Sequence, residues 1–169
     1  IVLHANRVPR SSNPTGEQLL RLAGTTIDPV PLDPAVARDV NSAFMSRQVF
    51  RGLTKFDENL EPTPELAETI EISADGLTYR FTLSDNARFA DGRQISSDDV
   101  VYSLQKSADP DRSAYAGDYK GMTVEKVDDQ TVAITLDVPV SPTLFLPKVA
   151  NYAGGFIISS KAAEAMGDD

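Results

Sequence analysis

The sequence contains no cysteine and only one histidine among its 169 residues. The lack of cysteine excludes disulfides, thiolate nucleophiles and cysteine metal sites, and it leaves the redox compartment open. The single histidine, His4, lies in a ragged N-terminus, where a disordered leader is the simplest interpretation. Catalysis that depends on histidine is therefore disfavoured within this chain.

Long apolar runs are also missing. No stretch approaches the ~20 consecutive apolar residues of a membrane helix, and the N-terminus has neither an initiator methionine nor a hydrophobic signal core. We expect a mature or trimmed chain. Lysine and arginine number 16 against 25 aspartates and glutamates, giving a net charge of -9. Such a charge repels phosphate backbones and anionic headgroups, which disfavours binding to nucleic acid or to a membrane surface.

The first third of the chain predicts a polar lead-in followed by alternating strand, loop and helix. Residues 1–18 have the composition of a flexible leader, and residues 19–26 predict a strand that the following prolines end. Residues 37–53 have apolar side chains at helical spacing, with Gly52 as the expected stop. We expect Phe44, on this helix, to lie in the core.

Alternating apolar residues beside turn signals predict two β-hairpins. Residues 77–83 alternate after an Asp-Gly turn. Val124 and Val127 precede a second, acidic turn at residues 128–130, and Val132, Ile134 and Leu136 alternate after it. Ser141 followed by proline predicts a short helix that ends by Pro147. A last strand over residues 155–159 leads to a helix that a serine starts and Gly167 ends.

The stretch FADGRQISSDDVVYSLQK carries adjacent carboxylates at the expected start of a helix. With Ser96 as the N-cap, Asp99 falls at the third helical position, which gives a capping box, and Ile95 and Val100 form a hydrophobic staple. Asp98 and Asp99 also face the positive end of the helix dipole. We interpret these carboxylates as structural signals and not as reactive groups.

Motifs for chemistry are incomplete. Residues 109–120 begin like a calcium loop, but Ala114 stands where the loop needs glycine and Lys120 where it needs a bidentate glutamate. The sequence has no Gly-x-Ser-x-Gly elbow, no phosphate-cradling glycine loop and no His-Glu-x-x-His pair. We therefore expect no catalytic residue, no metal site and no cofactor.

The order of several segments resembles the N-terminal part of the family 5 extracellular solute-binding proteins, the receptors of peptide, dipeptide and nickel ABC importers. The resemblance runs from about Leu19 to Gly167. The segments that carry it are LDPA, VFRGLTKFDENLEPTPELAETIEISADGLTYRFTL, ARFADGRQISSDDVVYSLQK, DDQTVAITL and IISSKAAEAMG. Two positions depart from the family's usual pattern: Ser84 stands where arginine is common, and Ala90 where histidine or a polar residue is common.

The resemblance implies an α/β receptor of the periplasmic-binding-protein type II kind that closes two lobes on a solute. Within this chain the class is α+β, with the first strand of lobe I and an accessory subdomain of β-hairpins and helices. The implied divisions are a leader (1–18), the first strand and loop of lobe I (19–36), the accessory subdomain (37–155) and a strand and helix returning toward lobe I (156–169). Family members are much longer, so we expect the second lobe to lie outside this chain.

The resemblance also implies candidate ligand-binding residues. In similar proteins the loop after the first strand and the segment after the capped helix approach the cleft, which corresponds to Thr26, Ile27 and Asp28 and to Tyr115. A tyrosine suits this role because it combines a flat apolar face with one polar group. A simpler role in packing or in a turn stays open for Tyr115 and Asp28.

The leading hypothesis is a binding module: part of a monomeric, exported receptor, periplasmic or tethered at the cell surface, that passes an oligopeptide or dipeptide to an ABC permease. One alternative is an exported hydrolase or other enzyme whose catalytic part lies elsewhere. Another is a stand-alone interaction domain. A nucleophile with its base, or a cluster of metal ligands, in the complete reading frame would favour the enzyme.

Overall fold

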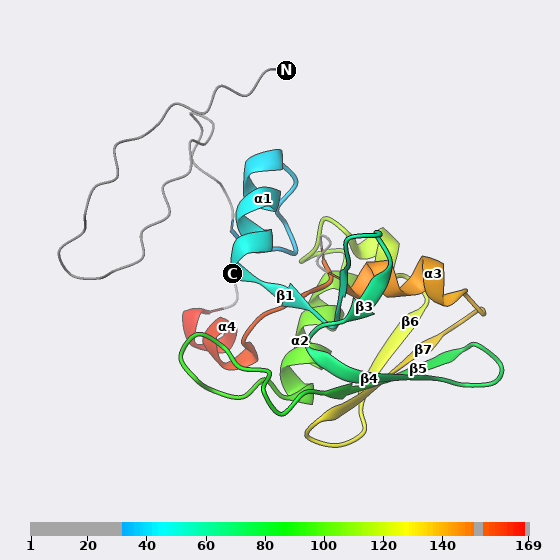
Figure 1. Cartoon of the computed structure of the whole chain (residues 1–169). Helices are drawn as coiled ribbons and strands as arrows, with labels where there is room; N and C mark the ends of the chain where they lie inside the picture. Colours follow the sequence, from blue (N-terminus) through cyan, green and yellow to red (C-terminus); the bar gives the residue numbers. More distant parts are fainter. Residues whose placement is uncertain (1–31, 151–153, 168–169) are drawn as a thin grey trace.

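The structure is a computed structural model, and it describes residues 32–150 and 154–167. Its centre is a four-stranded antiparallel sheet in the order β4-β5-β7-β6 (Figure 1). Helix α2 (Ser97–Ala108) packs against β6 and β7 and also contacts α4 (Ser160–Met166). The mixture of helices and an antiparallel sheet agrees with the predicted class. The predicted leader, the first strand and His4 lie outside the described residues.

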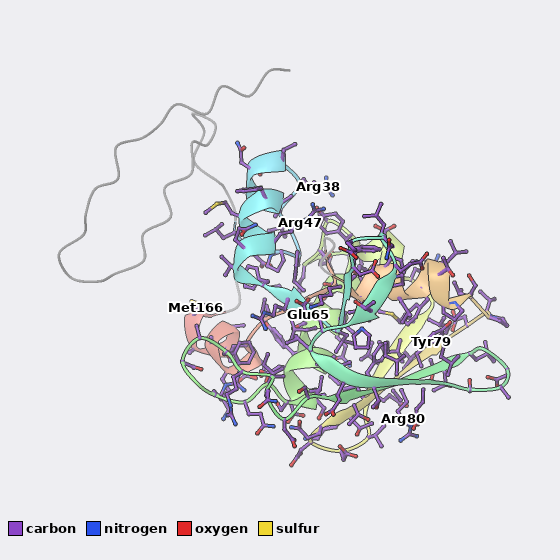
Figure 2. All side chains as sticks on the ribbon, viewed as in Figure 1. Arg38, Arg47, Glu65, Tyr79, Arg80 and Met166 are labelled. Atoms are coloured by element: carbon purple, nitrogen blue, oxygen red, sulfur yellow. The ribbon has the colours of Figure 1, made fainter. Side chains whose placement is uncertain are left out.

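The first predicted hairpin is confirmed as β4 (Ala67–Ile72) and β5 (Thr78–Leu83). Gly76 takes a positive φ of 70° in the turn, a conformation that glycine adopts without strain. Tyr79 and Phe81 are fully buried while Arg80 between them is exposed, as strand alternation requires. Figure 2 shows Tyr79 inside the body of the molecule and Arg80 on the outer side of the sheet.

The second predicted hairpin is confirmed as β6 (Met122–Lys126) and β7 (Thr131–Leu136). Strand β7 also pairs with β5, so the two hairpins join at the middle of the sheet. Val132 and Ile134 on β7 are fully buried and form one core with Val100 and Leu104 of α2. The sheet and α2 therefore share a single apolar interior.

Short elements surround this sheet. The remaining elements, in chain order, are β1 (Arg51–Gly52), β2 (Thr54–Phe56), β3 (Pro62–Pro64), η1 (Ala116–Tyr119), α3 (Pro142–Phe145), η2 (Leu146–Val149) and β8 (Phe156–Ile157). Strand β3 tolerates two prolines because, among the described strands, β2 alone pairs with it. The predicted strand over residues 155–159 is shorter than expected, since β8 spans two residues.

Both helices predicted late in the chain are present. Ser141 precedes α3, which starts at Pro142, and the chain continues as the 3-10 turn η2 beyond the expected stop at Pro147. Ser159 caps α4 by accepting a hydrogen bond from the N–H of Ala162, at 3.2 Å. Gly167 ends α4 in the left-handed conformation, with φ of 90°.

Helix α1 differs from its prediction in length and in what it buries. The helix spans Val40–Val49, and Gly52 belongs to strand β1 and does not stop the helix. Phe44 is 50% exposed, so its predicted place in the core is wrong. The side chains that α1 buries are Ser42 and Ser46. Helical spacing of apolar residues indicates a helix but does not show which side packs against a neighbour.

Candidate functional site

The turn before α1 is fastened to the loop after α2. The N–H of Ala114 donates a hydrogen bond to the carbonyl of Ala35 at 2.9 Å, and the Ser113 hydroxyl donates to the same carbonyl at 3.1 Å. The Arg38 guanidinium donates to the carbonyl of Ala114 at 3.3 Å. Two segments nearly eighty residues apart in sequence thus form one surface.

Tyr115 lies at the centre of this junction. Its hydroxyl donates a hydrogen bond to the carbonyl of Ala37, and its N–H donates to the Ser113 hydroxyl at 3.0 Å. The side chain is half-buried and packs against the hydrophobic core. Because the hydroxyl already donates to the backbone, any contact of Tyr115 with another molecule would use mainly the exposed part of its ring.

An ion pair strengthens the same junction. The ammonium group of Lys106, near the end of α2, lies 2.9 Å from a carboxylate oxygen of Asp33. The other carboxylate oxygen of Asp33 accepts a hydrogen bond from the N–H of Ala35 at 2.9 Å. Because Lys106 is buried, its charge needs such a partner. The pair therefore holds the turn of residues 33–37 against α2.

A hollow of about 730 Å³ opens beside the ion pair. It lies between the end of α1, the loop before α2, strand β8 and helix α4. Its lining is largely apolar and includes Leu32, Val49, Phe50, Phe89, Ile157 and Met166. Asp33 and Lys106 are among the charged residues that line it. Ala90, one of the two departures from the family's pattern, lines it as well.

The sequence-predicted ligand residues are only partly described. Thr26, Ile27 and Asp28 lie outside the described residues. Tyr115 is described, and it contacts the turn that follows that loop in sequence. Sequence reasoning missed Asp33 and Lys106, because nothing in the sequence pairs two charges 73 residues apart. No local pattern marks Lys106 for burial, because most of the residues that α2 buries are polar and the fold decides which side is covered.

Asp99 has the predicted capping role and a wider one. Its carboxylate accepts a hydrogen bond from the N–H of Ser96 at 3.0 Å, so the capping box is confirmed. Arg93 donates two hydrogen bonds to it, each of 2.9 Å, and the N–H and hydroxyl of Ser160 donate at 3.0 and 2.9 Å. Arg93 also donates to Ser159 at 2.8 Å. Asp99 therefore fixes the start of α4 to the start of α2.

The charge of Asp99 is stabilised although the side chain is fully buried. Burial raises its pKa, but the hydrogen bonds from Arg93, Ser96 and Ser160 outweigh burial and lower the pKa to about 2, from an ordinary 3.8. Asp99 is thus an anion at neutral pH with its hydrogen-bond acceptors occupied. Such a group holds a fold together and is poorly placed to move a proton.

Two properties of the described residues bear on other functions. Across residues 32–150 and 154–167, no group of three or more histidine, cysteine, aspartate or glutamate side chains is arranged to hold a metal ion. Within the same ranges, no helix has the length and apolar character needed to cross a membrane.

Comparison with known proteins gives one consistent family. A model of bacterial extracellular solute-binding proteins, family 5 (middle region), matches residues 61–168. Oligopeptide-binding protein OppA of Bacillus subtilis (strain 168) is 29% identical over 154 residues, which are 81% of this chain and 28% of OppA. Glutathione-binding protein GsiB of Salmonella typhi is 34% identical over 140 residues, which are 82% of this chain and 27% of GsiB.

A solved structure agrees with these matches. MoaA from Agrobacterium tumefaciens R10, in complex with mannopinic acid, superposes with a TM-score of 0.77 at 38% identity, over 84% of this chain and 30% of MoaA. The chain spans less than a third of the length of each of these proteins. The matches confirm the resemblance and the class of fold inferred from the sequence. The chain therefore belongs to the family 5 bacterial extracellular solute-binding proteins, which are transport components and not enzymes.

Proposed function

We propose that this chain is the N-terminal part of the solute-binding receptor of an ABC importer, and that the receptor captures an oligopeptide or dipeptide and delivers it to a membrane permease. The observation that carries the proposal is the family match over residues 61–168, together with OppA, an oligopeptide-binding protein, among the relatives. We place the receptor outside the cytoplasmic membrane, in the periplasm or tethered at the cell surface, and expect it to be a monomer.

In this proposal, residues 19–36 belong to lobe I, residues 37–155 form an accessory subdomain and residues 156–169 return toward lobe I. Thr26, Ile27, Asp28 and Tyr115 are the proposed ligand contacts. The contact between Tyr115 and the carbonyl of Ala37 supports this grouping, because it ties the tyrosine to the turn that follows the proposed ligand loop. The ion pair between Asp33 and Lys106 holds the same turn against α2.

Peptides suit such a site for a physical reason. A receptor that encloses its ligand between two lobes gains affinity from surface burial and from hydrogen bonds to the ligand backbone, which every peptide shares. A tyrosine ring at the cleft adds a flat surface that accepts side chains of different shape. Asp28, as a carboxylate, would complement a cationic group such as a peptide's N-terminus.

A second candidate solute is a compound resembling mannopinic acid. The observation that favours it is the 38% identity to MoaA, whose structure contains mannopinic acid. This value exceeds the 29% identity to OppA and the 34% identity to GsiB. In both cases the protein is the receptor of an ABC importer, and only the solute differs.

The test is a calorimetric titration of the full-length receptor with dipeptides, tripeptides, longer peptides, glutathione and mannopinic acid. We expect saturable binding of at least one peptide with a Kd in the micromolar range or below, and a Tyr115→Ala receptor with at least about tenfold weaker binding. Saturable binding of mannopinic acid without any peptide would select the second candidate. A folded receptor that binds none of these solutes would contradict the proposal.

A further inference from the structure

Five contacts join the turn of residues 33–38 to the end of α2 and to the loop that follows α2. Four of these contacts are hydrogen bonds that end on a backbone carbonyl. The fifth is the ion pair between Lys106 and Asp33, at 2.9 Å. Of the five contacts, the ion pair alone joins two side chains, so it depends on the residue type at both of its ends.

Stability alone does not account for a lysine at position 106. Lys106 is 8% exposed and lines a hollow whose lining is largely apolar. Removing an ammonium group from water is costly, and an apolar pair of similar size often gives a fold equal or greater stability than a buried ion pair. What an ion pair adds is a fixed distance and direction. Asp33 is held in this way at both oxygens, by Lys106 and by the N–H of Ala35.

The turn that the ion pair fixes also carries the contact of Tyr115. Further along this turn, the carbonyl of Ala37 accepts the hydrogen bond from the Tyr115 hydroxyl. A shift of the turn would therefore either move the tyrosine ring or break this hydrogen bond. On the other side, the proposed ligand loop ends at Asp28, five residues before Asp33 in the sequence. The ion pair thus lies between the two groups of proposed ligand contacts.

We infer that Lys106 and Asp33 are positioning residues for solute binding: their ion pair holds Tyr115 and the turn after the proposed ligand loop in the geometry that a bound solute meets. The inference rests on the proposed function, which makes Tyr115 a ligand contact. Neither charged side chain is assigned a contact with the solute. The pair acts because a junction that is ordered before the solute arrives does not have to be ordered during binding, and this raises affinity.

The double variant Asp33→Asn/Lys106→Met separates positioning from stability. It removes both charges together, so no charge stays buried without a partner, and methionine adapts well to an apolar lining. The asparagine keeps an oxygen that can accept from the N–H of Ala35. In the full-length receptor, we expect a Tm within about 3 °C of wild type. Calorimetry with dipeptides, tripeptides, glutathione and mannopinic acid should show at least about tenfold weaker binding of each solute that wild type binds.

Asp99→Asn is the matched control, because it breaks the ion pair with Arg93 at the other end of α2. We expect this variant to lower the Tm by more than the double variant does, and to leave solute affinity within about twofold of wild type. Unchanged affinity in the double variant would overturn the inference. An equal loss of affinity in Asp99→Asn would also overturn it, because general destabilisation would then explain both results.

A second readout asks whether the pair acts through Tyr115. When Tyr115→Ala is added to the double variant, the combined loss of affinity should fall well short of the product of the separate losses, because both changes disturb the same contact. Losses that multiply in full would show that the pair and the tyrosine act independently, which contradicts a positioning role.

Hydrogen exchange at the amide of Ala114, which donates to the carbonyl of Ala35, reports on the junction without any solute. We expect exchange at least about fivefold faster in the double variant than in wild type, and close to wild type in Asp99→Asn. A wild-type receptor that binds no solute contradicts the proposed function, and the exchange rate then decides whether the pair holds the junction. Solute binding that is equal in wild type and in the double variant leaves the proposed function standing and removes the inference.

Discussion

At the scale of single residues, Asp99 joins three segments of the described structure. It receives hydrogen bonds from the loop before α2, from the first turn of α2 and from the first turn of α4. Its neighbour Asp98 is exposed and pairs with Lys126 at 2.9 Å at the surface. The two adjacent carboxylates therefore contribute differently to stability. Burial strengthens the electrostatic contacts of Asp99, whereas water screens those of Asp98.

Replacement of Asp99 should be far more costly than replacement of Asp98. We expect Asp99→Asn to lower the free energy of unfolding by about 3 kcal/mol, because it leaves the Arg93 guanidinium partly buried without its anion. Asp98→Asn, the matched control, should change it by less than about 0.5 kcal/mol. Urea denaturation followed by circular dichroism measures both. Similar losses for the two variants would show that the buried network contributes little.

The same residue predicts a pH dependence with a definite sign. Its pKa of about 2 in the folded protein lies below the ordinary 3.8, so the folded state binds fewer protons than the unfolded state between these values. The stabilisation is complete above about pH 4 and is lost as the pH falls toward 2. The difference in unfolding free energy between wild type and Asp99→Asn should therefore shrink over that interval.

Other carboxylates contribute equally to the pH dependence of the unfolding free energy in both proteins. Asp39, Asp57, Asp75 and Asp128 accept hydrogen bonds that lower their pKa values as well, and both proteins contain them. The comparison with Asp99→Asn removes their contribution. A constant difference between the two proteins from pH 5 to pH 2 would contradict the assignment to Asp99.

At the scale of elements, the pairing of β1 with β8 joins two segments that are far apart in the sequence. Gly52 pairs with Phe156, and a side chain at Gly52 would place its Cβ 2.5 Å from the carbonyl oxygen of Ala150. The sequence suggested that this glycine stops a helix, but its role is to permit close approach of two backbones. Helical spacing could not reveal this, because Ala150 is distant in sequence.

The close approach predicts a specific sensitivity to an added methyl group. Gly52→Ala should lower the free energy of unfolding by about 1–3 kcal/mol, because the obstructing atoms belong to the backbone and have little freedom to move. Gly117→Ala is the control, since a Cβ at Gly117 meets nothing within 4 Å. Thermal denaturation distinguishes the two. A loss for Gly117→Ala as large as that for Gly52→Ala would refute the steric explanation.

At the scale of the whole molecule, residues 32–150 and 154–167 form a sheet-and-helix body with one apolar core and a largely apolar hollow beside α1 and α4. The chain corresponds to less than a third of each of the relatives compared above. In the receptor proposed above, the sheet, α2 and the junction around Tyr115 would support one wall of the solute site, and other polypeptide would supply the opposite wall.

The consequence is a negative binding result for the chain alone. The 169-residue chain should show no saturable micromolar binding of any solute that the full-length receptor binds, because a single wall buries too little of a small ligand. Calorimetry with the same solutes on both proteins measures this. Tight, saturable binding by the 169-residue chain would show that its own surface forms a complete site.

The sequence by itself determined the two hairpins, the capped helix α2 and the ends of α4, because turns, caps and alternation depend on residues close together in the chain. It also determined the family, through the order of these segments. Tertiary structure alone decided that Phe44 is exposed, that Gly52 permits a backbone contact, and that Lys106 pairs with Asp33. The physical reason is common to all three: burial and pairing depend on which distant segment arrives beside a residue, and local spacing carries no record of that.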